Sequence, residues 1–224
     1  MDLFNDELVK FVGFGGIMAI AGGVGGWVLR GLTYLRYRPY LDISTTLAIV
    51  DQGITVGIPD LPAGPLRCVR LPVHNLLGRD PVKSCRAELI ATQDVRPDGR
   101  LGPNHMHDRR PVCWEGSNTD TAADFTCDLR SDDVRRLEVV FASAAEGFLR
   151  FRVHPCYSLP RCGRFLLTIR MTADHVRNPP LVYILVECHG PFYTLRACRA
   201  DHTGQPLPGC ELSGPPVISA VVAG

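Results

Sequence analysis

Residues 84–92 read SCRAELIAT, and small or apolar side chains alternate there with a second set of side chains that is mostly polar. Successive side chains of a β-strand point to opposite faces, so a period of two predicts a strand with one buried face. The side chains expected to face the core are Cys85, Ala87, Leu89 and Ala91.

The same period recurs toward the C-terminus. Alternating segments are RRLEVVFAS (135–143), FLRFRVHP (148–155), RFLLTIRMTAD (164–174) and FYTLRACRA (192–200). In the first of them Leu137, Val139 and Phe141 are expected to face the core. LVYILVEC (181–188) is apolar on both faces, as in a central strand. Seven to nine such strands, separated by Gly, Pro, Asn and Asp, predict an all-β fold, an immunoglobulin-like antiparallel β-sandwich over residues 41–224.

Proline inside one of these segments carries its own prediction. Pro72 lies in VRLPVHN (69–75), and proline cannot donate a hydrogen bond to a neighbouring strand. We therefore expect an edge strand or a β-bulge at Pro72.

One local pattern resembles a known group of proteins. PLRCVRLPVHNLLGRDPVKSCRAEL (65–89) combines a strand ending in Asn75, a turn with Gly78 and a strand opening at Ser84. It resembles the hairpin of uncharacterised prokaryotic membrane-anchored β-sandwich proteins, as do RRPVCWEG (109–116) and CDLRSDDVRRLEVVF (127–141). The resemblance covers residues 66–173 and implies a fold without supplying catalytic residues. Leu77 and Gly78 lengthen the usual turn, and Cys113 stands where an apolar residue is common.

The N-terminal segment has a different character. KFVGFGGIMAIAGGVGGWVLRGL (10–32) contains seven glycines among the nineteen uncharged residues 11–29. A helix of that length spans about 28 Å, close to the hydrocarbon core of a bilayer. The glycine spacing does not match a phosphate-binding loop, and the acidic leader is unlike that of a signal peptide. We therefore expect a tail (1–10), a single transmembrane helix (11–32) and a juxtamembrane linker (33–40) before the sandwich.

Small residues gather on one side of this predicted helix. A smooth face lets the backbone of a second helix approach closely in lipid, so a helix-packing role is expected. The alternative, a helix that merely tolerates glycine, stays open. The residues of this face are Gly15, Ala19, Gly22, Gly23 and Gly26.

Charge and cysteine content predict the orientation. Arg30, Arg36 and Arg38 follow the apolar segment while the leader is acidic, which predicts a single-pass protein with a cytoplasmic C-terminal body. Nine cysteines, an odd number without a compact spacing, favour a reducing compartment and no structural disulfide.

Candidate chemistry is sparse. GPNHMHDRRPVCW (102–114) brings metal-ligating residue types into one expected loop, for which a solvated loop is the alternative. Cys156 and Cys162 are a weaker redox or metal candidate, and adjacent Cys188 and His189 would face opposite ways on a strand. The four metal candidates are His105, His107, Asp108 and Cys113.

Composition narrows the function classes. The net charge of +1 gives no bulk field for nucleic acid, and no cofactor motif is present. Arg136, Arg150 and Arg152 are expected on solvent-facing positions. The sequence leans away from an enzyme and predicts a membrane-tethered interaction module that presents loops or an edge strand to an unknown partner. The expected partners are membrane lipid and either another protein or a second copy that associates through the transmembrane helix. The alternative is a metal-dependent or catalytic protein that uses the His105 loop.

Overall fold

The chain divides into two units, Met1–Arg38 and Pro39–Gly224. The structure is a computed structural model that describes residues 26–30, 39–52, 66–117, 125–143, 149–155, 157–159, 163–176, 180–189 and 194–212. Each unit is considered by itself below.

The described part of the first unit is one short helix over residues 26–30. Trp27, Val28 and Leu29 are exposed on it, and a Cβ atom added at Gly26 would meet nothing within 4 Å. Among the residues the structure describes, no helix has the length and apolar character needed to cross a bilayer. The other helix-packing candidates, Gly15, Ala19, Gly22 and Gly23, lie outside the described residues, so the packing role stays a prediction.

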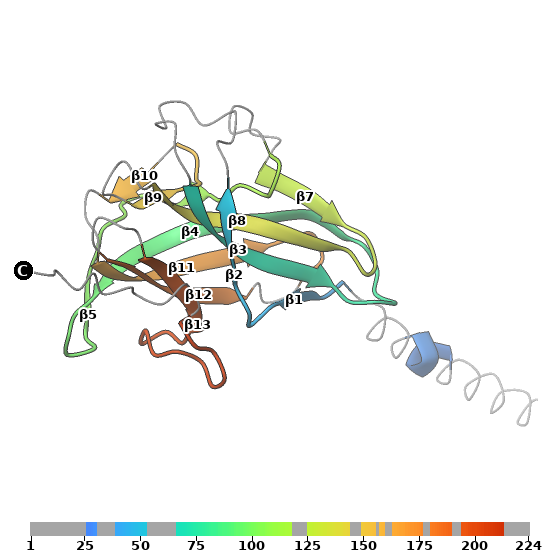
Figure 1. Cartoon of the computed structure of the whole chain (residues 1–224). Coiled ribbons are helices and arrows are strands. Elements are labelled where there is room, and N and C mark those ends of the chain that lie inside the picture. Colours follow the sequence, from blue (N-terminus) through green and yellow to red (C-terminus); the bar gives the residue numbers. More distant parts are fainter. Residues whose placement is uncertain are drawn as a thin grey trace, which may run out of the picture. The chain divides into compact units, whose positions relative to one another are not determined.

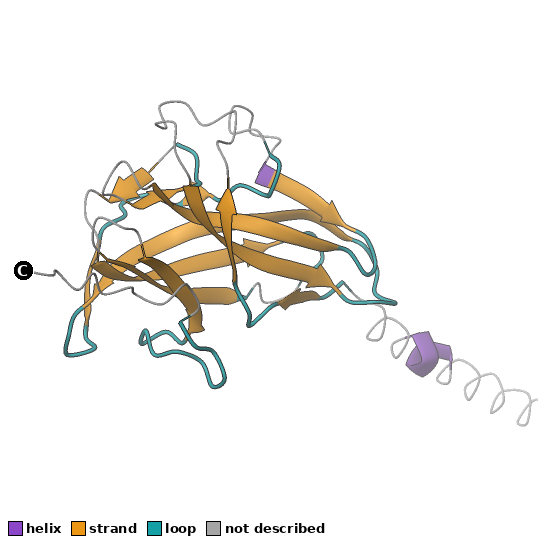
Figure 2. Cartoon of the chain, in the orientation of Figure 1, coloured by secondary structure: helices purple, strands orange, loops and turns teal. Residues whose placement is uncertain are grey.

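The second unit consists of two antiparallel sheets, which confirms the all-β sandwich (Figures 1 and 2). The first sheet has the order β1-β3-β8-β9-β10, with β2 also paired to β3. Its strands are β1 (Leu41–Ile43), β2 (Ala48–Gln52), β3 (Leu66–Asn75), β8 (Val134–Ser143), β9 (Leu149–Phe151) and β10 (Tyr157–Leu159).

The second sheet has the order β13-β12-β11-β4-β5, with β6 and β7 both paired to β4. The long strand β4 thus has β11 on one side and three short segments on the other. Its strands are β4 (Val82–Val95), β5 (Leu101–Asn104), β6 (Arg110–Pro111), β7 (Thr126–Leu129), β11 (Gly163–Thr172), β12 (Leu181–His189) and β13 (Thr194–Ala200).

The main core lies between the two sheets and is built from the inward side chains that the period of two predicts. In β11 all four predicted residues belong to it, and in β9 and the bridge after it so do Leu149, Phe151 and Val153. The β11 residues are Phe165, Leu167, Ile169 and Met171. Strand β12 is buried on both faces, because Ile184 belongs to the main core and Leu185 to a second cluster on the other side of this sheet. The prediction of a central strand at 181–188 is confirmed.

β-Bulges change the predicted alternation in two strands. The register of β3 and β8 shifts between Val69 and Arg70, so Val139 and Val140 both join the core. Phe141 consequently lies on the outer face, and its predicted inward position is wrong. In β4 the register with β11 skips Ile90, so the buried position passes from Leu89 to Thr92 rather than to Ala91. A bulge inserts one residue and reverses the phase of a period of two.

The position of Pro72 corrects the edge-strand prediction. β3 lies inside its sheet, between β1 and β2 on one side and β8 on the other, and the nearby bulge is at Val69/Arg70. Ser44, in the connection from β1 to β2, donates its N–H to the Pro72 carbonyl over 3.1 Å. The proline nitrogen therefore faces this break between β1 and β2, where a ladder donor is not required.

Candidate functional site

In the loop predicted to bind metal, His105 is paired with a carboxylate side chain. His105 follows β5, and its Nε2 atom lies 2.8 Å from Oδ2 of Asp94 on β4. Both side chains are about a quarter exposed, at 24% and 28%. The Tyr157 hydroxyl donates to the His105 carbonyl over 3.4 Å, and the Arg110 guanidinium stacks over the Tyr157 ring. This arrangement holds the loop between β5 and β6 against β10.

The other three metal candidates do not join His105. His107 and Asp108 are exposed, whereas Cys113 is fully buried and donates its backbone N–H to Arg152. Within the described ranges, no group of three or more His, Cys, Asp or Glu side chains is placed to hold a metal ion. Of the weaker candidates, Cys188 is a core residue, while Cys156 and Cys162 lie outside the described residues.

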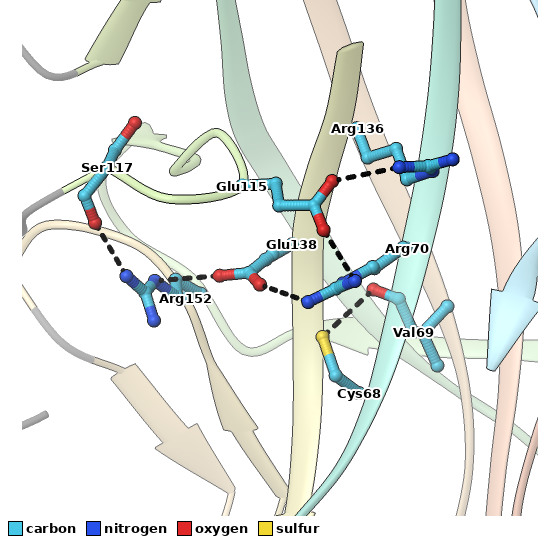
Figure 3. A network of polar contacts seen from close by, with 8 residues as sticks. All are labelled: Cys68, Val69, Arg70, Glu115, Ser117, Arg136, Glu138 and Arg152. Carbon is cyan, nitrogen blue, oxygen red and sulfur yellow. Dashed lines mark hydrogen bonds and ion pairs between the residues drawn. The ribbon is translucent and has the colours of Figure 1, made fainter. Parts of the chain in front are cut away.

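The strongest polar feature is an ion-pair network on the outer face of the first sheet (Figure 3). Arg70 on β3 contacts Glu138 on β8 over 3.0 Å and Glu115 over 2.6 Å. Arg152 approaches the other oxygen of Glu138 at 3.2 Å, and Arg136 contacts Glu115 at the same distance. The Glu138 side chain is only 4% exposed, so its charge is balanced by two arginines inside the protein.

Strand pairing brings these five residues together. Arg70 and Glu138 are register partners directly beside the bulge at Val139 in β8. The segment after β6 crosses from the second sheet to the first, where Glu138 donates its N–H to the Cys113 carbonyl over 3.0 Å and Glu115 donates to Arg136 over 2.8 Å. Ser117 extends the contact by accepting from Arg152 over 2.7 Å. The network therefore fastens the crossing segment to β8.

Burial corrects one prediction about the arginines. Arg152 was expected to face solvent, yet its side chain is 9% exposed and its guanidinium lies over the Phe141 ring. Arg136 is half exposed, as expected for the rim of the network. The sequence does show charged residues at alternate positions of FLRFRVHP and RRLEVVFAS. This pattern places them on the outer face of the sheet, but it does not tell whether another segment covers that face.

Cys68 lies beside this network. Its Sγ atom donates to the carbonyl of Val69, and its register partner is Phe141. Burial, followed by the charge of Glu138, raises the pKa of the Cys68 thiol to about 12, although Arg70 opposes the shift. The thiol is therefore neutral and unreactive at physiological pH.

A second feature is an apolar end of the sandwich, formed where β1 begins, β3 ends and β8 begins. The turn that joins β3 to β4 lies there, at the right-hand end of the sandwich in Figure 1. Leu41 pairs with Asn75, so Tyr40 and Leu76 lie next to one pair of opposite residues. Val134 pairs with His74, one residue before Asn75, and therefore lies at the same end. Exposed side chains at this apolar end are Tyr40 at 46%, Leu76 at 38%, Leu77 at 79% and Val134 at 43%.

Side-chain hydrogen bonds hold the turn that carries Leu76 and Leu77. The Asn75 side chain donates to the Asp80 carbonyl over 2.9 Å and to the Leu129 carbonyl over 3.2 Å. Gly78 has a φ of 77° and donates its N–H to the Ser131 hydroxyl over 2.8 Å. These contacts confirm the predicted turn at Gly78, where the positive φ suits glycine.

Comparison with known proteins finds no match to this chain among protein-family models, curated proteins or solved structures.

Proposed function

We propose that this chain is a membrane-tethered β-sandwich, immunoglobulin-like in architecture, that binds a protein partner through its apolar end. The observation that carries the proposal is the gathering of Tyr40, Leu76, Leu77 and Val134 at one end of the first sheet. Contiguous exposed apolar side chains mark interaction surfaces, whereas scattered ones do not. Among the exposed large hydrophobic side chains described in the sandwich unit, the one elsewhere is Leu181.

The described sheet edges favour loops over an edge strand as the contact. The edge strands β1, β2, β5, β6, β7 and β10 have two to five residues each, too short to template a long added strand. The end of β13 is already covered, because Leu207 donates its N–H to the Arg199 carbonyl and Ala200 bridges to Pro206.

The charges around the apolar end favour a protein over the lipid surface as the occupant. A surface that binds anionic lipid carries a cluster of cations. Here exposed cations and anions are mixed. They are Lys83, Arg130, Arg135 and Arg136 against Asp42, Asp80, Asp128 and Asp132.

The tether in this proposal is the predicted transmembrane helix at residues 11–32, with the body on the cytoplasmic side. Its support is the apolar run and the arginines that follow it, Arg30, Arg36 and Arg38. The sandwich unit starts at Pro39, next to Tyr40 of the apolar end.

A photo-crosslinking amino acid at position 77 of the full chain, in its native membranes, tests the proposal. The matched control carries the same group at Leu181, which is 46% exposed on the second sheet. We expect a discrete adduct with another protein from position 77 and none of that mass from position 181. Lipid adducts from position 77, an adduct to a second copy of this chain, or equal adducts from both positions would contradict it.

The alternative is a metal-dependent or catalytic protein that uses His105, His107, Asp108 and Cys113. The His105–Asp94 pair is the observation in its favour, since a carboxylate often orients a histidine ligand or base. Titration of the full chain and of its His105→Gln variant with Zn²⁺ tests the alternative. Stoichiometric Zn²⁺ binding by the parent that is lost in the variant would support a metal site at His105.

A further inference from the structure

Two cysteines face each other across neighbouring strands of the second sheet. Cys85 on β4 is the register partner of Cys127 on β7, and Arg86 pairs with Thr126 beside them. Cys85 is fully buried in the main core, and Cys127 is partly exposed and packs against the same core. No other register pair in the described strands joins two cysteines.

The spacing of such a pair suits a covalent bond. Directly opposite residues of antiparallel strands have Cα atoms about 4.5 or 5.5 Å apart, and a disulfide accommodates about 4.4–6.8 Å. The two thiols are also close enough to share a hydrogen bond. Closing the bond therefore requires side-chain rotation rather than rearrangement of the strands.

We propose that Cys85 and Cys127 form a reversible disulfide when the protein meets a low-molecular-weight disulfide, which makes the β4–β7 pair an oxidation site. The Cys127 thiolate attacks one sulfur of the small disulfide, forms a mixed disulfide and releases the first small thiolate. The Cys85 thiolate then attacks the Cys127 sulfur, closes the protein disulfide and releases the second small thiolate. Two protons leave the protein cysteines, and the two electrons reduce the small disulfide to two thiols.

The order of the two steps follows from exposure. Cys127 is the accessible sulfur, so it reacts first. The hydrogen bond from its neighbour and burial both raise the pKa of Cys85, so the second step is slow near neutral pH and accelerates as the pH rises. The two cysteines therefore stay reduced in a reducing compartment and form the disulfide only under sustained oxidation.

The disulfide would restrain the segment that connects the second sheet to the first. β7 belongs to the second sheet and leads through residues 130–133 into β8 of the first. The Leu129 carbonyl at the end of β7 accepts from Asn75, the residue before the apolar turn. The disulfide would therefore stabilise the backbone on which Leu76, Leu77 and Val134 are mounted. The oxidation site itself does not depend on the proposed partner binding.

Oxidation of the full chain with oxidised glutathione, followed by alkylation and peptide mapping, tests the proposal. We expect a peptide pair joined through Cys85 and Cys127, a rate of closure that rises up to about tenfold per pH unit between pH 7 and 9, and a higher denaturation midpoint after closure. Reduction with a dithiol should reverse all three changes.

Two variants separate the steps. Cys85→Ala should accumulate the mixed disulfide on Cys127, and Cys198→Ala, which changes a buried cysteine of another strand, should close the bond like the parent. The proposal is overturned if the parent chain itself keeps a stable mixed disulfide at Cys127, or if both cysteines remain alkylatable after oxidation.

Discussion

Arg70 and Glu138 are register partners on the neighbouring strands β3 and β8, and their side chains form an ion pair of 3.0 Å in which Glu138 is 4% exposed. Arg152 reaches the second oxygen of the same carboxylate. One buried anion thus joins two strands and the bridge that follows β9. Such an arrangement is costly to break, because Arg152 would lose the carboxylate it contacts and Arg70 would keep only Glu115 as a counter-charge.

We predict that Glu138→Gln lowers the free energy of unfolding by about 3–5 kcal/mol, the usual cost of removing one partner from a buried ion pair. Urea denaturation of the sandwich monitored by tryptophan fluorescence measures the change. The matched control is Glu88→Gln, which breaks the more exposed Arg86–Glu88 pair of 3.3 Å and should cost less than about 1 kcal/mol. Equal losses in the two variants would show that the network adds no stability beyond a surface pair.

Cys68 predicts a loss of stability at alkaline pH. Its folded pKa of about 12 exceeds the ordinary value of 9.0, so the folded state binds more protons than the unfolded state between these values. The contribution of Cys68 to the free energy of unfolding is fully present below pH 9. It falls as the pH rises toward 12, by up to about 1.4 kcal/mol per pH unit. Unfolding measured at pH 8 and pH 10.5 should show a smaller decrease in Cys68→Ala than in the parent. An unchanged decrease would assign the alkaline loss to other groups.

Asn75 predicts the strength of the turn at the apolar end. Its side-chain amide satisfies two backbone carbonyls, so Asn75→Ala leaves both without this donor and should cost about 2 kcal/mol of unfolding free energy. Asp80→Asn is the control, because it keeps the Asp80 carbonyl and changes an exposed side chain, and we expect less than about 0.5 kcal/mol. Thermal unfolding of both variants compares them, and a loss in the control as large as in Asn75→Ala would contradict the assignment.

The predicted orientation can be tested at sites chosen from the structure. Native cysteines are poor reporters, because five of the seven described are buried. Leu77→Cys places a thiol at a position that is 79% exposed, and Asn5→Cys places one in the N-terminal tail. In intact cells an impermeant maleimide should label position 5 and should label position 77 only after lysis. The opposite pattern would reverse the orientation.

The glycine face predicts helix association. Gly22 and Gly26 are one turn apart, and replacing both by Leu fills the groove while keeping the segment apolar. The control replaces Ile17 and Val24 on the opposite face by Leu. A two-helix reporter in a bacterial membrane should lose its signal with the glycine pair and retain it with the control. Association of both variants at the level of the parent would leave the helix as a tether alone.

The period of two decided the strands because it depends only on neighbouring residues. Segments such as Phe165–Met171 and Leu149–Val153 alternate in the sequence and do so in the structure, since a pleated strand exposes alternate side chains to opposite faces. The turn at Gly78 was equally local, because a positive φ favours glycine. For the same reason the all-β class and the doubly buried strand at 181–188 could be predicted.

Tertiary structure alone decided the bulges, the sheet order and the ion-pair network. One inserted residue at Val139 reverses the face of Phe141, and its position is set by pairing with β3, which is about seventy residues away in the chain. Arg152 and Glu138 look like solvent-facing charges in their own strands, and they become buried partners only where the crossing segment and β8 meet. Cys85 and Cys127 likewise become a pair through register. Local spacing determines which side chains share a face, whereas contacts between distant segments determine what that face meets.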